Sequence, residues 1–346
     1  MEPAHSGLAG SAPVFIVGSG RSGTSLLRAM LVAHPAVHLA QEAMFFPWTR
    51  AATPWESADR RLDRWLASFS FAWLRLDLGE VRRRFPPPLP AARLPEVYGW
   101  VLRELAARHG ATRWGDKTPP NSLYLREIFG AFPDARVILV VRDPRDVVLS
   151  LETSPFTAGS RTALLLLGRA MRRRMAPWME RLHVVRLEDL AGNPAATMSR
   201  VLEFVGEPWD DAVLAHHERV PADDPPYPWT RGASQPLRAC RPRWPAEMEP
   251  SWVRIVERLA AGSMAPRGYA PADLPEEPSR GAMARAVLAD LPEAVRFAGR
   301  AARVYGRLWR RTPAGPAETQ RRVLSLNPRV REAHPDWTMP DPPSTP

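Results

Sequence analysis

The stretch PVFIVGSGRSGTSLLRAMLVAHP, residues 13–35, decides the fold that the sequence predicts. Its apolar run VFIV stops at Gly18, and an apolar-periodic segment follows over residues 26–34. This order of features is typical of a strand, a glycine-rich loop and a helix. A loop in that position presents free backbone N–H groups at the start of a helix, where anions bind. We therefore expect residues 18–25 to hold a phosphate-like group.

Two later segments repeat the pattern of a strand followed by a helix. Residues 137–141 read VILVV, break at RDPRD and lead into a helical start. Residues 183–187 are followed by a helix pattern over residues 195–205. Short apolar strands that alternate with helices predict an α/β fold with a parallel sheet.

The composition excludes several classes of protein. With 346 residues, 45% hydrophobic and 24% charged, the chain is neither disordered nor collagen-like. A single cysteine, Cys240, excludes an internal disulfide, and eight scattered histidines lack metal-site spacing, so we expect no metal. No apolar run approaches the roughly 18 residues of a membrane span, and the opening residues do not resemble a signal peptide. We expect a cytoplasmic protein. The net charge of +10 favours anionic ligands, and we expect no nucleic-acid partner.

Residues 18–25 fit two general nucleotide-binding patterns in part. Their three glycines spell GxGxxG, and Glu42 lies roughly where a dinucleotide fold carries its ribose-binding acid, which would make the protein a Rossmann NAD(P)-dependent oxidoreductase. The loop also nearly spells the P-loop of nucleotide triphosphatases, but Thr24 replaces the lysine. Hydroxyls of Thr24 and Ser25, with Arg21 as the cation, could still hold one phosphate-sized group.

A second anion site is predicted after the VILVV strand. Arg142 follows that strand directly, at the edge where open α/β sheets bind ligands, and Ser150 lies two turns along the next helix. Two anion sites far apart in sequence indicate a ligand with phosphate at both ends, such as a 3′,5′-substituted nucleotide. The alternative is an Arg–Asp network within RDPRD that closes the helix start.

Lys117 stands out because 46 of the 47 basic residues are arginine and it is the one lysine. An ammonium is a compact point charge that can follow negative charge on a single oxygen, whereas guanidinium suits two-toothed contacts. We therefore predict a chemical role for Lys117.

Three segments resemble one family. GSGRSGTSLLRAML with the following AHPAVHLAQE resembles the 5′-phosphosulfate loop of sulfotransferases that use 3′-phosphoadenosine 5′-phosphosulfate (PAPS). GDKTP resembles the family's lysine motif, and VILVVRDPRDVVLSL resembles its 3′-phosphate motif. The chain is most similar to the branch that contains tyrosylprotein sulfotransferases and many bacterial sulfotransferases. The resemblance covers about residues 13–270.

The resemblance implies a P-loop-type parallel sheet flanked by helices, with PAPS as co-substrate, adenosine 3′,5′-bisphosphate as product and no metal. It assigns catalytic roles to Glu42 as the base and to Arg21 and Lys117 as the cations that stabilise the leaving oxygens. The residues that would bind the nucleotide are Gly20, Arg21, Ser22, Gly23, Thr24, Ser25, Arg142 and Ser150. A late basic–Trp pair, Arg243 and Trp244, is left out of the predicted site.

The acceptor would be a hydroxyl group. Peptide-sulfating members follow their glutamate with Thr-x-Arg-like residues, whereas here Ala43 and Met44 follow. We therefore expect a small alcohol, phenol or sugar, held in an apolar pocket of Met44, Phe45, Phe46 and Trp48. A tyrosylprotein sulfotransferase is the alternative within the family, and a nucleotide-binding protein without enzymatic activity is the alternative outside it. Oligomeric state stays open.

The predicted domain organisation has three parts: a disordered N-terminus over residues 1–12, a sulfotransferase domain over 13–270, and a C-terminal extension over 271–346. Apolar and aromatic residues spaced over 62–76 predict a helical face in the core. The extension contains a Pro-rich linker and a basic amphipathic helix, whose shared apolar face would hold Val295, Ala298, Ala302, Tyr305 and Trp309. We expect this helix to pack on its own domain, with membrane contact as the less favoured alternative.

Overall fold

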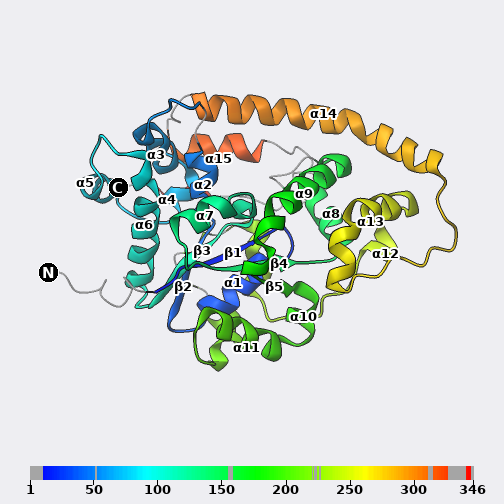
Figure 1. Ribbon diagram of the computed structural model, residues 1–346, viewed down its shortest axis with the longest axis horizontal. Coiled ribbons are helices and arrows are strands. Elements are labelled where there is room, and N and C mark those ends of the chain that lie inside the picture. The colour runs from blue at the N-terminus through cyan, green and yellow to red at the C-terminus, as the bar shows by residue number, and fades with distance from the viewer. Residues whose placement is uncertain are drawn as a thin grey trace.

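A five-stranded parallel sheet forms the centre of the computed structural model, with the order β2-β3-β1-β4-β5 (Figure 1). The strands are β1 (Val14–Gly18), β2 (Val37–Gln41), β3 (Arg113–Lys117), β4 (Arg136–Val141) and β5 (Leu182–Arg186). The structure describes residues 11–50, 53–154, 159–219, 221, 224–225, 227–310, 315–325 and 340–343. The predicted fold class, a parallel α/β sheet flanked by helices, is confirmed, and the predicted strands β1, β4 and β5 are present.

Strands β2 and β3 were not predicted from the sequence, because neither is a continuous apolar run. β2 reads VHLAQ and β3 reads RWGDK, yet β3 lies between β2 and β1 and pairs with both. Gly115 lets β3 approach β1 closely, since a side chain there would come within 1.8 Å of the Val14 carbonyl oxygen. The polar end of β3 is buried at the site described below.

Helices cover both faces of the sheet. On one face, α1 (Thr24–Val32), α10 (Leu187–Gly192) and α11 (Pro194–Val205) pack on alternate strand residues such as Val14 and Ile16. On the other face, α6 (Leu94–Arg108) and α7 (Leu125–Ala131) pack on the intervening residues. Further helices are α2 (Phe45–Thr49), α5 (Leu78–Arg84), α8 (Pro144–Glu152), α9 (Arg161–Met175), α12 (Trp244–Glu247) and α13 (Pro250–Met264), and short 3₁₀ turns include η1 (Ala91–Arg93), η2 (Pro119–Leu123), η3 (Ala176–Arg181) and η6 (Pro228–Ser234).

The aromatic-rich segment over residues 62–76 lies in the core, as predicted, but in more than one helix. α3 (Ala58–Leu66) ends there and α4 (Phe69–Ala72) begins at once. Ser68 causes the break, because its side chain accepts a hydrogen bond from the Phe71 amide and so caps the new helix. The six predicted apolar residues are all buried: Leu62, Trp65, Leu66, Phe69, Trp73 and Leu76.

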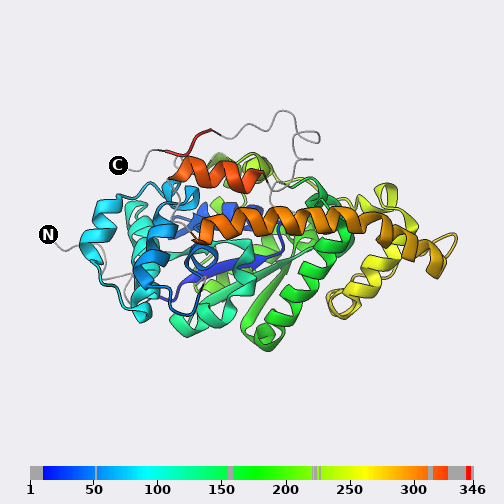
Figure 2. The ribbon, with the colours of Figure 1, turned by 90° about the horizontal axis from the view of Figure 1, so that it is seen from above.

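The C-terminal extension contains α14 (Arg280–Arg310) and α15 (Pro316–Leu324). Figures 1 and 2 show α14 running along the outside of the molecule beside α15. α14 packs on the domain through Phe297, Ala301, Val304 and Tyr305, which contact the main core. α15 is tied to α4 by a 2.8 Å hydrogen bond from the Phe69 amide to the Thr319 hydroxyl. The extension is therefore packed on the domain, which is the favoured form of the prediction.

The predicted apolar face of α14 is wrong. Val295 is 70% exposed, and Ala298 and Ala302 are exposed as well, whereas Tyr305 points into the core. A different face of α14 turns inward, because α14 also packs on α9. There the Asp290 carboxylate accepts a hydrogen bond from the Ser160 hydroxyl. Trp309, the last residue of that predicted face, lies outside the described side chains.

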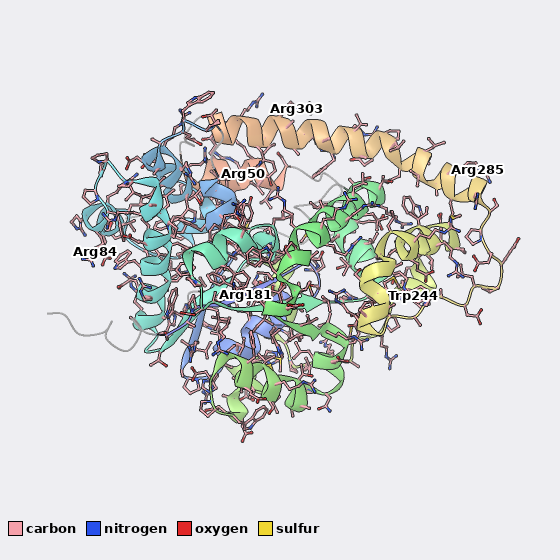
Figure 3. The ribbon with its side chains drawn as sticks, viewed as in Figure 1. Arg50, Arg84, Arg181, Trp244, Arg285 and Arg303 are labelled. Atoms are coloured by element: carbon pink, nitrogen blue, oxygen red, sulfur yellow. The ribbon has the colours of Figure 1, made fainter. Side chains whose placement is uncertain are left out.

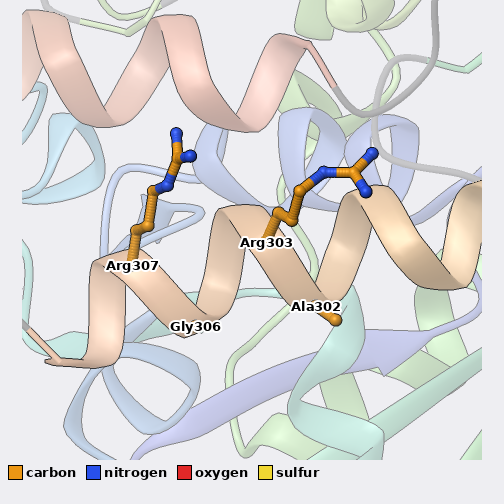
Figure 4. Close-up of a pocket in the computed structure, with 4 residues that line it drawn as sticks. All are labelled: Ala302, Arg303, Gly306 and Arg307. Atoms are coloured by element: carbon orange, nitrogen blue, oxygen red, sulfur yellow. The ribbon is translucent and has the colours of Figure 1, made fainter.

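Two surface features of the described residues, the distribution of arginines and a pocket, do not coincide with the predicted site. Figure 3 labels arginines on separate parts of the chain, among them Arg84, Arg181 and Arg285, so the positive charge is spread and does not by itself mark a site. A pocket of about 310 Å³ lies on α14, lined by Ala302, Arg303, Gly306 and Arg307 (Figure 4). None of the predicted site residues is among them. No described helix combines the length and apolar character needed to cross a membrane.

Candidate functional site

The loop between β1 and α1 has the backbone of an anion-binding turn. Gly18, Arg21 and Gly23 all have positive φ angles, of 157°, 65° and 98°. At residue 23 a side chain would lie 2.6 Å from Leu187, so only glycine fits there. α1 begins directly afterwards without a side-chain cap and without an acidic residue in its first turn. Its first amides could therefore bind an anion, and the anion site at residues 18–25 stays a prediction.

The 3′-phosphate motif lies next to this loop. Arg21 Nε donates a 3.0 Å hydrogen bond to the Ser150 hydroxyl, 129 residues further along the chain. Arg142 Nη1 donates to the Arg21 carbonyl oxygen at 3.4 Å. The sheet order explains this, because β1 and β4 are neighbours and their carboxyl ends meet. The structure therefore brings Arg21, Arg142 and Ser150 together.

The positive charges of Arg21 and Arg142 are only partly balanced by nearby carboxylates. Arg142 Nε is buried and has no hydrogen-bond partner among the residues that the structure describes. Its nearest carboxylate, Asp146, lies 3.5 Å away and also accepts from the Arg243 and Trp244 amides. Burial lowers the pKa of Arg21 and the nearby charge of Arg142 lowers it further, while the Glu42 carboxylate opposes this change and Arg243 adds to it. Clustered cations with an orphaned buried donor fit a multiply charged anion such as phosphate.

The Arg–Asp network that was the alternative interpretation of RDPRD is present, and it includes both arginines: Arg145 pairs with Asp143, and Arg142 pairs with Asp146. Asp143 caps α8 by accepting from the Arg145 amide at 2.9 Å, and its other oxygen pairs with Arg145 Nη2 at 2.6 Å. Arg145 also pairs with Glu257 at 2.7 Å. This network secures α13 to the start of α8. Arg145 is thus structural, and Arg142 is the arginine that reaches the loop.

Lys117 connects the loop to Glu42. Its Nζ lies 2.5 Å from Glu42 Oε1 and 3.3 Å from the Ser25 hydroxyl. The lysine is fully buried and Glu42 is mostly buried. Burial lowers the pKa of Lys117, while the Glu42 carboxylate opposes that change. An ammonium and a carboxylate in contact beside an anion-binding loop can serve as electrophile and base for a reaction at that loop.

Three further residues near the site were missed or left out. Arg21 Nη1 donates a 2.8 Å hydrogen bond to the carbonyl oxygen of Trp229, in η6. Arg243 is close enough to Arg21 to affect its pKa. Asp116 accepts from the Ala43 amide beside Glu42. The basic–Trp pair at 243–244 was the one sequence signal for any of these residues.

The predicted apolar acceptor pocket is wrong in most of its residues. Phe45, Phe46 and Trp48 are at least 93% buried, with exposed fractions of 2%, 7% and 4%, and belong to the main core. Phe45 stacks on Tyr98 with ring centroids 4.4 Å apart. These side chains fill the space between α2 and α6 because the chain turns inward directly after Glu42. Met44 alone of the four remains partly exposed.

The order of the strands argues against a Rossmann dinucleotide site. The usual dinucleotide fold places its second strand beside the first, so that the acid after the second strand meets the ribose. Here β3 separates β2 from β1, and the carboxylate of Glu42, after β2, is paired with Lys117. Glu42 therefore faces the end of β3.

Comparison with known proteins shows the family to which the chain belongs. A model of the Sulfotransferase family matches residues 13–211, more than half of the chain. The chain belongs to this family. The matched region contains every residue of the predicted site. The Arg243–Trp244 pair and the C-terminal helices lie beyond it.

Among the family's characterised members, protein-tyrosine sulfotransferases are similar to this chain. Protein-tyrosine sulfotransferase A of Caenorhabditis elegans is 29% identical over 232 residues, which are 61% of this chain and 54% of that protein. Protein-tyrosine sulfotransferase 2 of Gallus gallus is 30% identical over 223 residues, 60% and 54% of the two chains. The chain thus spans about half the length of these relatives. The predicted resemblance to tyrosylprotein sulfotransferases is confirmed, whereas a bacterial origin stays a prediction.

A solved structure with some similarity is the sulfotransferase domain from the Synechococcus PCC 7002 olefin synthase. It has a TM-score of 0.46 and 19% identity, and the match covers 80% of this chain and 99% of that domain. Among the residues that the structure describes, no group of three or more His, Cys, Asp or Glu side chains could hold a metal ion. The roles predicted for the individual site residues remain predictions, as do the domain boundaries.

Proposed function

We propose that this protein transfers a sulfuryl group from PAPS to an acceptor hydroxyl, with Glu42 as the base. The observation that carries the proposal is the contact of Lys117 with both the Glu42 carboxylate and the Ser25 hydroxyl of the loop. It joins a base to a buried cation at an anion-binding turn. Membership of the sulfotransferase family supports the same reaction.

The described residues fit PAPS at both ends. The loop over residues 18–25 and the start of α1 would hold the 5′-phosphosulfate. Arg142 and Ser150 would hold the 3′-phosphate, for which the unpartnered Arg142 Nε is available. When bound, PAPS supplies the sulfuryl group and a good leaving group, adenosine 3′,5′-bisphosphate.

The transfer balances as one displacement at sulfur. A bond forms between the acceptor oxygen and sulfur, and the bond from sulfur to the bridging phosphate oxygen breaks. The acceptor proton passes to the Glu42 carboxylate. Lys117 leaves its contact with Glu42 and donates to the bridging oxygen, where negative charge grows, and Arg21 adds a second positive charge. As in phosphoryl transfer, most of the catalysis comes from positioning and charge stabilisation.

For the acceptor we propose a tyrosine hydroxyl in a protein. The relatives are protein-tyrosine sulfotransferases, which favours this acceptor over the small molecule that the sequence analysis ranked first. The burial of Phe45, Phe46 and Trp48 also removes the apolar pocket on which the small-molecule interpretation rested. Small alcohols, phenols and sugars remain the alternative acceptors, and the cytoplasmic location remains an expectation.

A transfer assay tests the proposal. Purified protein is incubated with sulfur-labelled PAPS and tyrosine-containing peptides, and in parallel with small phenols, alcohols and sugars. We expect label on the peptides, and loss of roughly a hundredfold or more in kcat for Glu42→Gln, because the base is removed. Label on small molecules alone would overturn the protein-tyrosine acceptor. No transfer to any acceptor, with intact binding of adenosine 3′,5′-bisphosphate, would overturn the enzymatic function.

A further inference from the structure

The turn that carries Glu42 is fastened to the end of β3 at three successive amides. The Glu42 amide donates to the Lys117 carbonyl oxygen at 2.9 Å. The Ala43 amide donates to Asp116 Oδ1 at 3.1 Å, and the Met44 amide donates to the Thr118 hydroxyl at 3.2 Å. Three consecutive residues of the turn are thus held by three consecutive residues at the end of the neighbouring strand.

This turn needs external support. Glu42 and Met44 have φ angles of 58° and 53°, in the left-handed region that side chains other than glycine disfavour. Such a backbone persists only where the surrounding structure holds it. The side chain that holds the middle of the turn is Asp116, whose carboxylate accepts from the Ala43 amide.

Asp116 is itself rigidly held. It is fully buried, and Oδ2 accepts from the Tyr98 hydroxyl at 2.9 Å and from Asn121 Nδ2 at 3.2 Å. Tyr98 is completely buried as well, where it stacks on Phe45 of α2. A buried carboxylate with donors on both oxygens is a fixed acceptor for the Ala43 amide.

Successive residues of β3 reach Glu42 by different routes. Asp116 and Lys117 point to opposite faces of the sheet, because side chains alternate along a strand. Lys117 contacts the Glu42 carboxylate directly, whereas Asp116 holds the backbone one residue later. One strand end therefore places both the base and the cation that receives the leaving oxygen.

We propose that Asp116 is a positioning residue for Glu42: through the Ala43 amide it holds the 42–44 turn so that the carboxylate stays beside Lys117. This inference rests on the proposed function, since it assumes that Glu42 is the base. It concerns a residue that touches neither the acceptor nor the nucleotide. For this role, residue 116 must hold a hydrogen-bond acceptor oxygen at a fixed position beside the Ala43 amide.

The test compares two substitutions that keep the number of side-chain heavy atoms. Asp116→Leu removes the acceptor, and we expect kcat to fall about thirtyfold because the base is misplaced, with affinity for adenosine 3′,5′-bisphosphate unchanged. Asp116→Asn keeps an acceptor oxygen for Ala43; its new amide group would face the Tyr98 hydroxyl and Asn121, and a rotation of the Asn121 amide would turn the unpartnered Oδ1 toward it as an acceptor. We expect Asp116→Asn to recover most of the lost kcat. Equal losses in both variants would overturn the proposal.

Hydrogen exchange of the 42–44 peptide gives a second readout that needs no acceptor or PAPS. It should accelerate in Asp116→Leu and stay slow in Asp116→Asn. Unchanged exchange in Asp116→Leu would overturn the positioning role, whereas absence of transfer by the wild-type protein would overturn the proposed function, so the two failures are distinguishable.

Two neighbouring substitutions separate positioning from general loosening. Thr118→Val removes the acceptor of the Met44 amide and tests the fastening of the turn if Asp116→Leu does not fold. We expect kcat to fall about fivefold and hydrogen exchange of the 42–44 peptide to become faster. Tyr98→Phe removes one donor to Asp116 but leaves the turn fastened. We expect it to lower the melting temperature while kcat stays within about threefold. A larger loss of kcat in Tyr98→Phe than in Thr118→Val would contradict the proposed route.

Discussion

The two halves of the site differ in how their charges are balanced. At the phosphate end, which is the loop over residues 18–25 with Arg142 and Ser150, two arginine charges lie close together: Arg142 pairs with Asp146 only at 3.5 Å, and its buried Nε has no hydrogen-bond partner among the described residues. The transfer end, Glu42 with Lys117, is a closed ion pair with its atoms 2.5 Å apart. The phosphate end is therefore ready for an anion, whereas the transfer end must open before it can react.

This difference suggests an order of events. An anion at the phosphate end relieves the repulsion between Arg21 and Arg142 and satisfies the buried Arg142 Nε. At the transfer end, Lys117 can exchange Glu42 for a new partner only when the bridging oxygen of PAPS lies beside it. Glu42 would then be free to accept a proton. Binding and catalysis should thus respond to different substitutions, and the predictions below test that separation.

The largest effect is expected for Lys117→Met, which removes the charge and shortens the unbranched side chain by one atom. We predict that kcat falls roughly a hundredfold to a thousandfold, because the leaving oxygen loses its buried cation. Affinity for adenosine 3′,5′-bisphosphate, measured by calorimetry, should change much less. A kcat within about threefold of wild type would show that Lys117 does not stabilise the transfer. Circular dichroism controls for folding.

Arg142→Ala should have the reverse effect of Lys117→Met, with a larger change in nucleotide affinity than in kcat. We predict that affinity for adenosine 3′,5′-bisphosphate falls about ten- to a hundredfold, since charged hydrogen bonds to the 3′-phosphate are lost. Adenosine 5′-monophosphate, which lacks that phosphate, should bind both proteins equally. Arg136→Ala is the matched control, because Arg136 is exposed at the opposite end of the same strand. Equal losses for both nucleotides would break the distinction between the two ends.

The phosphate end could be predicted from the sequence because parallel strands end at a common edge. The glycine pattern located the loop, and the strand before Arg142 placed that residue at the same edge. Lys117 was found through the arginine bias of the chain, although its strand was not. β2 and β3 were missed because their polar ends serve the site and hide the apolar pattern of a buried strand.

The surroundings of the transfer end could not be predicted. The Ala43 contact with Asp116 joins residues 73 positions apart. The local periodicity of the sequence gives no information about contacts between residues so far apart. Phe45 and Phe46 were assigned to a pocket because composition does not reveal that the turn at Glu42 directs them into the core. The left-handed backbone at Glu42 and Met44 is the physical reason for that direction.

A smaller effect is predicted for the pH dependence of nucleotide binding in Glu42→Gln. Burial lowers the pKa of Lys117 and the Glu42 charge raises it, so removal of that charge should lower the pKa further. Lys117 would then lose its proton, and with it its attraction for the 5′ group, at a lower pH than in wild type. Calorimetric titration of adenosine 3′,5′-bisphosphate across a pH series measures this. A shift toward higher pH would contradict the coupling of the pair.

The smallest effect is expected for Ser150→Ala, at the phosphate end. The Ser150 hydroxyl accepts a 3.0 Å hydrogen bond from Arg21 Nε, so its loss frees the guanidinium without removing a charge. We predict a loss of about two- to fivefold in affinity for adenosine 3′,5′-bisphosphate, the size of one neutral hydrogen bond, and an unchanged kcat at saturating PAPS. A marked fall in kcat would mean that Arg21 acts mainly on the transfer step and that Ser150 sets its position. In that case Arg21 belongs to both ends of the site, and the separation between binding and transfer holds only for Arg142 and Lys117.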